Sequence, residues 1–590
     1  MRTFAAAIAL AVAMPAMPTV ALAQTEDAAS QDWVGTSNAY TQQVIDMQAQ
    51  FFPTGASSAG YDQYDGLVND MSLDRDDRYV AAASALKAKF EAALASESNP
   101  YVKQDLQILI DSLNQDIEGF ALNRQYMLEY NDVPQGLFGS IGQLLSDQTA
   151  EARRPKALEL LKRFTGQWLG TEPMTTLAKR RFEASRGEGK MGPYKVEIEE
   201  TVAKVPIFVS GIRELFAKYE IGGADTALDA MEQQLTEYGE WTRATVLPTA
   251  RDNPRLPPEL YALSLRQVGI DMDPLEAIEE ARRGFYEVRA QMEALAPQIA
   301  AKNGWTETDY KSVMRRLKQD TIPAEEIEEF YRGVNAELEA KIRENQIVSL
   351  PDTVLQMRVA SVAESAAQPA PHMRPPRLIG NTGEQGTFVL TVSNPTAPAD
   401  EAYDDFNHPA ASWTLSAHEA RPGHEMQFDA LVKQGVSLAR LLYAFNSVNV
   451  EGWALYAEAE MLPHEPIEGQ FIAQQFRLLR TARAFLDPML NLGMISREEA
   501  GRVLSEDALF SPGMVKQELD RYQFRAPGQA GSYYYGYRKL VDLRIETEVA
   551  LGERFNEKAF NDFLLSQGII PLDLMAKAVR EEFIPSQRAN

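Results

Sequence analysis

The chain has 590 residues, of which 45% are hydrophobic and 24% are charged, so it can bury a sizeable core. Its formal net charge of −26 opposes binding to a phosphate backbone and excludes nucleic acid as an expected partner. It contains no cysteine, so we expect neither a disulfide framework nor a lipid-bearing cysteine. The length favours several domains or one large domain with subdomains.

The first residues have the pattern of an export signal. Arg2 precedes an apolar run that is interrupted by prolines and ends in the small-x-small sequence Ala21-Leu22-Ala23. This pattern is typical of a signal peptide, and we assign residues 1–23 to it, with removal near Ala23. The run lacks the ~20 continuous apolar residues of a membrane span, and no later segment has them. We therefore expect a periplasmic or secreted protein without a transmembrane segment.

Most of the chain before residue 370 predicts amphipathic helices, and one segment shows this most clearly. Asp273 is suited to an N-cap, Pro274 to the first helical position, and Gly304 to the end of the helix. Between them, apolar residues recur three and four positions apart, which places them on one face. These residues are Phe285, Val288, Met292, Leu295 and Ile299. We assign residues 24–370 to a helical N-terminal portion.

The composition changes after this portion. Residues 366–380 are rich in proline and predict a boundary. Residues 386–395, GTFVLTVSNP, are rich in β-branched and aromatic residues and predict a strand. Helical patterns return from Ser412 onward. We therefore predict a mostly α protein with a small sheet, and assign residues 371–590 to a second portion that carries the functional site described next.

The sequence HEARPGHEMQ places two of the chain's five histidines around Glu419. His418 and His424 are six residues apart, or about 240° around a regular helix, so an unbroken helix cannot direct both at one metal ion. Pro422 and Gly423 break the helix and allow His424 to return to the face of His418. Glu419 then has the position of a general base beside a zinc site. Without a metal, the segment would be the end of one helix and the start of another.

A catalytic zinc site normally has a third protein ligand. Glu451 and Glu458 lie seven residues apart in NVEGWALYAEAE and share one helix face. We assign Glu451 as the ligand and Glu458 as the group that orients a histidine. A solvated acidic face is the alternative, but Trp453 beside these residues favours burial. His408 and His464 are interpreted as surface residues.

Three motifs occur in order along the chain: HEARPGHEMQ, VEGWALYAE and, at residues 526–540, APGQAGSYYYGYRKL. Together they resemble the bacterial domain-of-unknown-function 885 family, which in turn is similar to the gluzincin zinc metallopeptidases. The resemblance implies one zinc ion per chain on His418, His424 and Glu451, with Glu419 as the general base. It also implies a large helical fold with a small β-sheet beside the zinc site and a deep cleft.

The third motif matches the family pattern P-G-Q-A-x-x-Y-x-x-G with Tyr533 as its tyrosine. The resemblance implies that Tyr533 donates a hydrogen bond to the oxyanion that develops during hydrolysis. Because three tyrosines follow one another, Tyr534 or Tyr535 could take this place instead. The residues assigned to substrate binding are Arg521, Tyr522, Gln529 and Tyr534.

These assignments predict an exported zinc peptidase that hydrolyses short peptides, either as a carboxypeptidase or as an oligopeptidase. Arg521 would pair with the substrate's C-terminal carboxylate, although the net charge of −26 favours the opposite end. The strand at residues 386–392 would pair with an extended peptide by strand addition. Two alternatives are a zinc hydrolase of a non-peptide amide and a peptide-binding protein without catalytic activity.

Overall fold

A computed structural model describes residues 32–146, 149–360, 370–376, 385–391, 403–434 and 436–589, together with residues 381 and 383. The expected signal peptide at residues 1–23 lies outside these residues, as does most of the proline-rich segment 366–380. The protein is mostly helical with a small three-stranded sheet, as the sequence predicts. None of the helices in the described ranges is long and apolar enough to cross a bilayer.

The described chain forms two compact units. The first contains the residues up to Leu260 and the segment Ser437–Tyr443, and the second contains the rest from Tyr261 onward, except residues 381 and 383. The division falls within helix α11 (Pro258–Gln267), earlier than the predicted boundary at residues 370/371. The reason is that the helices between residues 274 and 345 pack into the core of the second unit.

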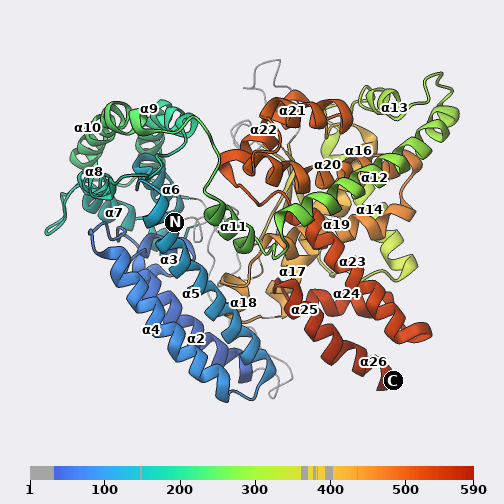
Figure 1. Cartoon of the computed structure of the whole chain (residues 1–590), viewed down its shortest axis with the longest axis horizontal. Coiled ribbons are helices and arrows are strands. Elements are labelled where there is room, and N and C mark those ends of the chain that lie inside the picture. Colours follow the sequence, from blue (N-terminus) through green and yellow to red (C-terminus); the bar gives the residue numbers. More distant parts are fainter. Residues whose placement is uncertain are drawn as a thin grey trace. The chain divides into compact units, whose positions relative to one another are not determined.

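The first unit is built from helices alone in its described residues. Its helices α2, α4 and α5 lie side by side and bury a core that includes Phe90, Leu106 and Leu109 (Figure 1). The helices of this unit are α2 (Asp32–Ala49), α3 (Pro53–Ser58), α4 (Arg75–Ser96), α5 (Pro100–Tyr126), α6 (Val133–Leu144), α7 (Lys156–Phe164), α8 (Met174–Ser185), α9 (Lys195–Lys218), α10 (Asp225–Trp241) and α18 (Leu438–Leu442).

The second unit carries the predicted metal ligands and the sheet. Its elements are α12 (Pro274–Asn303), α13 (Tyr310–Leu317), α14 (Ile327–Asn345), β1 (Gln356–Val359), β2 (His372–Arg374), β3 (Thr387–Leu390), α16 (Pro409–Glu419), α17 (His424–Gln434), α19 (Ser447–Met461), α20 (Ile467–Asn491), α21 (Arg497–Arg502), α22 (Pro512–Asp520), α23 (Ser532–Leu551), α24 (Glu557–Ser566), α25 (Leu572–Ala578) and α26 (Ile584–Ala589).

Helix α12 follows the sequence prediction closely. It begins at Pro274 after the N-cap Asp273, whose side chain accepts hydrogen bonds from the first-turn backbone, and it ends before Gly304, which adopts a left-handed conformation. Its predicted apolar face packs against α20 in the core of the second unit (Figure 1). Helix α20 is buried along nearly all of its length, so its polar residues lie in the interior.

The sheet has the order β1-β3-β2, so the strand predicted from sequence is the central one. β3 pairs in parallel with β1 and antiparallel with β2. Both of its edges are therefore occupied, and the expectation that an extended peptide adds to this strand is wrong. β2 is an outer strand, and it lies next to Glu419, as described below.

Helices α19 and α23 pack unusually closely, and two glycines make this possible. A Cβ atom on Gly452 would lie 2.7 Å from the backbone of Gly536, and one on Gly536 would lie 2.0 Å from the carbonyl oxygen of Val448. The closest approach therefore falls one residue from Glu451 and three residues from Tyr533. It fixes these two predicted site residues on facing helices.

Candidate metal centre

The HEARPGH segment forms a tight turn between two helices. α16 ends at Glu419 and α17 begins at His424, so the helix is broken where the sequence predicts. Gly423 is needed for space rather than for an unusual backbone angle, because a Cβ atom there would lie 1.9 Å from the carbonyl oxygen of His418. The turn brings the two histidine rings to a centroid distance of 4.8 Å.

Two buried side chains hold this turn in place. The indole Nε1 of Trp453 donates to the carbonyl oxygens of Pro422 and Gly423, at 3.0 and 3.3 Å. Arg421 is 1% exposed and pairs with Glu425, which lies at the start of α17. Because Glu425 is engaged by this arginine, Glu419 is the glutamate of the segment that is available to the site.

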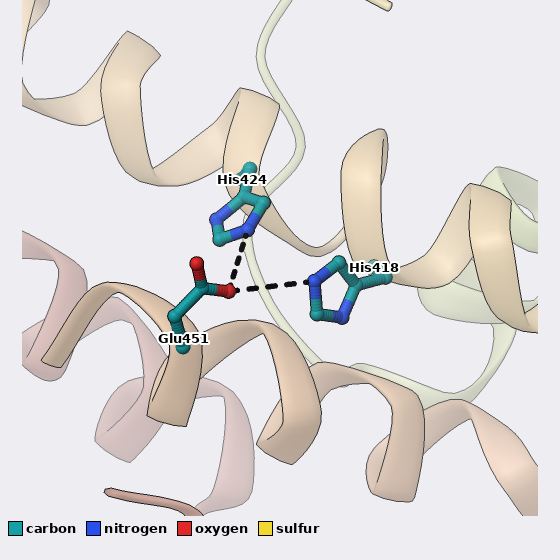
Figure 2. Close-up of side chains that lie close together, drawn as sticks. All are labelled: His418, His424 and Glu451. Atoms are coloured by element: carbon teal, nitrogen blue, oxygen red, sulfur yellow. Dashed lines mark ion pairs between the residues drawn. The ribbon is translucent and has the colours of Figure 1, made fainter. Parts of the chain in front are cut away.

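Helix α19 adds the third predicted ligand. The Oε2 atom of Glu451 lies 3.6 Å from Nε2 of His418 and 3.4 Å from Nε2 of His424 (Figure 2). One ligand atom from each of the three residues lies within 4.8 Å of the others. Three nitrogen and oxygen ligands about 2.1 Å from one tetrahedral zinc ion would be roughly 3.4 Å apart. The three predicted ligands therefore lie close enough together to hold one zinc ion.

The charges of this cluster agree with a cation site. Oε2 of Glu451 is buried and has no hydrogen-bond partner in the described part of the protein. Burial raises the pKa of Glu451, but its contacts with His418 and His424 outweigh this and hold the pKa well below the usual range. Burial likewise lowers the pKa of His418, but its contacts with Glu451 and Glu458 raise it to about 9. A metal ion would replace the proton that this arrangement otherwise attracts.

Glu458 contacts His418 as predicted for an orienting group. His418 Nδ1 lies 2.6 Å from Oε1 of Glu458, which is completely buried. A carboxylate at this distance is an acceptor, so it fixes the proton on Nδ1 and leaves Nε2 as the ligand atom. Arg480 lies 3.4 Å from the same oxygen and offsets the buried charge.

Glu419 lies beside the cluster without belonging to it. Its Oε1 atom is 3.9 Å from Nε2 of His418, and its Oε2 atom accepts a 2.8 Å hydrogen bond from the backbone N–H of Met373 in β2. The side chain is 13% exposed, so it reaches both the cluster and solvent. This is the position that the general-base assignment requires.

Of the three consecutive tyrosines, Tyr533 is the one next to the ligands. Its ring is nearly parallel to that of His418 at a centroid distance of 6.4 Å. The hydroxyl accepts a 3.2 Å hydrogen bond from Nη2 of Arg521. The other two tyrosines point elsewhere: the Tyr534 hydroxyl lies close to Gly284 in α12, and the Tyr535 hydroxyl bonds to Asp271.

The other predicted substrate-binding residues fall into two groups. Gln529 accepts a hydrogen bond from Arg521 and donates to Ser447, so it lies beside Tyr533. Tyr522 is fully buried, and its hydroxyl donates to Glu518 at 2.7 Å. Tyr522 and Tyr534 are therefore not brought to the ligand cluster, and their predicted contact with substrate does not agree with their positions.

Neither of the other nearby histidines joins the cluster. His464 is half-buried in the turn after α19. His408 is fully buried at the N-cap of α16, so its interpretation as a surface residue is wrong. The proline that follows it starts a buried helix rather than continuing an exposed loop.

Sequence reasoning missed two residues near the cluster. Arg480 and Arg483 lie on α20, and their guanidinium carbons are 5.8 and 4.4 Å from the ring centroid of Tyr533. Both side chains are almost completely buried. The available signal was a three-residue spacing of arginines, Arg477, Arg480 and Arg483, within the largely apolar stretch FRLLRTARAFL.

The fold and this site define a large, mostly helical protein with a candidate three-ligand metal centre. Residues 53–579 match the family described as bacterial protein of unknown function (DUF885), and the chain belongs to that family. This confirms the family resemblance seen in the three motifs. No curated protein matches the chain.

Two solved structures have the same fold. One is described as "a putative lipoprotein of unknown function" from Shewanella oneidensis; it is 19% identical, has a TM-score of 0.75, and the match covers 93% of this chain and 100% of that one. The other is described as "the putative lipoprotein from Colwellia psychrerythraea"; it is 18% identical, has a TM-score of 0.72, and the match covers 94% and 99%. At these identities the likeness extends to the fold alone.

Proposed function

We propose that this protein is an exported zinc-dependent peptidase that hydrolyses short peptides. The observation that carries the proposal is the convergence of His418, His424 and Glu451 on one point, with Glu419 directly beside it. Export is supported by the signal-like N-terminal sequence and by the description of both structural neighbours as lipoproteins.

The side chains around the cluster supply the parts of an amide hydrolysis. A zinc ion held there would act as a Lewis acid on the substrate carbonyl and lower the pKa of a water molecule. Glu419 accepts the proton of the attacking water and delivers it to the amine that leaves. Tyr533 donates a hydrogen bond to the carbonyl oxygen as negative charge develops on it. Glu458 keeps His418 in the required tautomer throughout.

The position of β2 supports a peptide as the substrate. Its Met373 N–H already donates to Glu419, so backbone hydrogen-bonding groups lie at the general base. An extended peptide beside an outer strand gains main-chain hydrogen bonds that a small amide cannot make. β2 therefore replaces β3 as the strand expected to contact substrate.

The first test is metal content and cleavage by the purified protein. We expect about one zinc ion per chain, and cleavage of a mixed peptide library with products identified by mass. His424→Ala should lose both zinc and cleavage because it removes a ligand. His464→Ala is the matched control, because His464 lies outside the cluster, and it should keep both. Full zinc occupancy in His424→Ala would contradict the ligand assignment.

A second variant separates catalysis from binding. Glu419→Gln keeps the shape of the side chain and removes the base, so zinc should remain while turnover falls at least ~10²-fold. Small amides and esters are assayed in parallel with the peptides. Hydrolysis of these compounds alone would show that the protein is a small-molecule hydrolase. Peptide binding without any turnover would show that it is a peptide-binding protein.

A further inference from the structure

Three arginine side chains surround the ring of Tyr533. α20 supplies Arg480 and Arg483, and the π-helical turn Arg521–Arg525 supplies Arg521, whose guanidinium carbon is 5.2 Å from the ring centroid. We call Arg480, Arg483 and Arg521 the arginine ring. Since Tyr533 also stacks on His418, the arginine ring lies on the tyrosine that borders the metal cluster.

The arginine ring is only partly neutralised by carboxylates. Glu518 forms two hydrogen bonds with Arg483, at 2.8 and 2.7 Å, and lies 3.5 Å from Arg521. Glu458 pairs with Arg480 but is already the acceptor for His418. Within the described residues, two carboxylates therefore form all the ion pairs of three guanidinium groups.

Asp487, the next acidic residue on α20, does not supply a third carboxylate to the arginine ring. Asp487 accepts hydrogen bonds from the backbone N–H of Gly528 and from the hydroxyl of Tyr261. It has no ion pair with the arginine ring among the described residues. A desolvated guanidinium without a full partner is costly, so the ring favours the entry of an additional anion.

Arg521 is the residue of the arginine ring that is accessible to such an anion. Its side chain is 20% exposed, whereas those of Arg480 and Arg483 are 6% and 7% exposed. Gln529 accepts from its Nε, and Gln529 is itself held by donating to Ser447. The guanidinium is thus oriented in advance at the border between Tyr533 and solvent, which reduces the entropy lost when a ligand binds.

We propose that the arginine ring, through Arg521, binds the C-terminal carboxylate of the peptide substrate and makes the enzyme act close to free carboxyl ends. This inference rests on the proposed peptidase function. A planar guanidinium binds a carboxylate through two parallel hydrogen bonds. The net charge of −26 does not oppose this, because diffuse surface charge is screened within about 10 Å while Arg521 acts at contact distance. Every unmodified linear peptide carries this carboxylate whatever its sequence.

The test measures binding and cleavage of the same tetrapeptides in four forms. They have a free C-terminus, a C-terminal amide, a C-terminal amide after a final glutamate, or an N-terminal acetyl group. Binding is measured by calorimetry on zinc-loaded Glu419→Gln, and cleavage on the unaltered enzyme. The free form should bind about 10- to 100-fold more tightly than the plain amide, the range for a charge-assisted pair. Acetylation should have little effect.

Two substitutions in the Glu419→Gln background assign the effect to the arginine ring. Arg521→Gln should remove the difference between the free and amidated forms, and Arg521→Lys should retain part of it. Arg525→Gln is the matched control, because Arg525 lies in the same turn with its side chain 53% exposed, and it should leave the difference unchanged. Zinc content and melting temperature verify that each variant is folded.

The outcomes separate this proposal from the peptidase proposal. Equal binding of free and amidated peptides overturns the arginine ring as an anchor, and so does loss of binding on acetylation. Tight binding of the amide that ends in glutamate would show that the site accepts a side-chain carboxylate. This result also overturns the proposal that it binds the C-terminal carboxylate. Carboxylate-dependent binding without cleavage by the unaltered enzyme keeps the anchor and removes the peptidase function.

Discussion

The two units bury charged residues in different ways. In the first unit, Arg75 and Arg181 are almost completely buried between Asp76 and Glu129, and each arginine contacts both carboxylates. Two cations therefore meet two anions. In the second unit, the arginine ring has three cations and two carboxylates. The comparison teaches that buried charge alone does not distinguish the two networks, whereas the arginine ring differs by its incomplete pairing beside the candidate metal ligands.

The second unit also contains a buried carboxyl group that has no hydrogen-bond partner among the described residues. Glu465 is 4% exposed, and neither of its oxygens has a hydrogen bond within the described residues. In the first unit, by contrast, Asp105 is equally buried but accepts hydrogen bonds from Ser437 and Arg440. The two carboxyl groups therefore differ in their surroundings, because hydrogen bonds hold Asp105 whereas Glu465 has none among the described residues.

The largest effect should come from breaking the balanced network of the first unit. Arg181→Met leaves Asp76 and Glu129 with one fewer cation in the interior. We expect a loss of about 3–5 kcal/mol in the free energy of unfolding, the usual result of removing one partner of a buried pair. Denaturant titration measures the loss, while zinc content per folded molecule should not change.

The neighbouring residue provides the control for this prediction. Arg180 pairs with Glu172 at the surface, where both side chains are about half exposed. Arg180→Met should therefore cost less than about 1 kcal/mol. An equal loss of unfolding free energy in the two variants would mean that the buried network of Arg181 contributes no more to stability than a surface ion pair.

A smaller effect should appear at Glu465, and its sign depends on pH. Burial raises the pKa of Glu465 to about 8, and the nearby charge of Glu458 adds to the rise. The folded protein keeps a proton that the unfolded chain, with an ordinary glutamate pKa near 4.5, releases. The free energy of unfolding therefore falls as the pH rises from about 4.5 to about 8.

Glu465→Gln removes this pH dependence because its amide does not titrate. At pH 7 the variant should be more stable than the unaltered protein by about 3 kcal/mol, and at pH 4 the two should be equal. The control is Glu468→Gln, which removes a partner of Lys302 and should destabilise slightly at pH 7. Thermal unfolding at both pH values measures these differences, and a gain of the same size at pH 4 would contradict the assignment.

The sequence predicts well the features that depend on local spacing. The ends of α12 follow from Asp273, Pro274 and Gly304, because caps act within one helical turn. The six-residue spacing around Pro422-Gly423 predicts a turn that joins His418 to His424, and the structure has this turn. The separation of seven residues between Glu451 and Glu458 predicts that they share one helix face, and in the structure both lie close to His418.

Features that depend on distant packing were not predicted. Arginines three residues apart on a helix normally indicate a solvated face, and only the helices packed around α20 bury Arg480 and Arg483. β1 and β2 have four and three residues, too few to show the alternation that identifies a strand, so the central position of β3 was not foreseen.

The smallest predicted effect concerns the contact that joins the arginine ring to the metal cluster. Glu458→Gln preserves the volume of the side chain but removes the charge that holds the Nδ1 proton of His418 and partly neutralises Arg480. Loss of such an orienting carboxylate typically weakens metal binding by about 10- to 100-fold. Competition with a chelator of known affinity measures the zinc dissociation constant. Glu460→Gln, two residues further along α19, removes a partner of Arg544 and not of His418, so it should leave this constant unchanged. An unchanged constant in Glu458→Gln would mean that Glu458 serves the charge balance of α20 and not the orientation of the histidine, and its role would then resemble that of the buried carboxylates of the first unit.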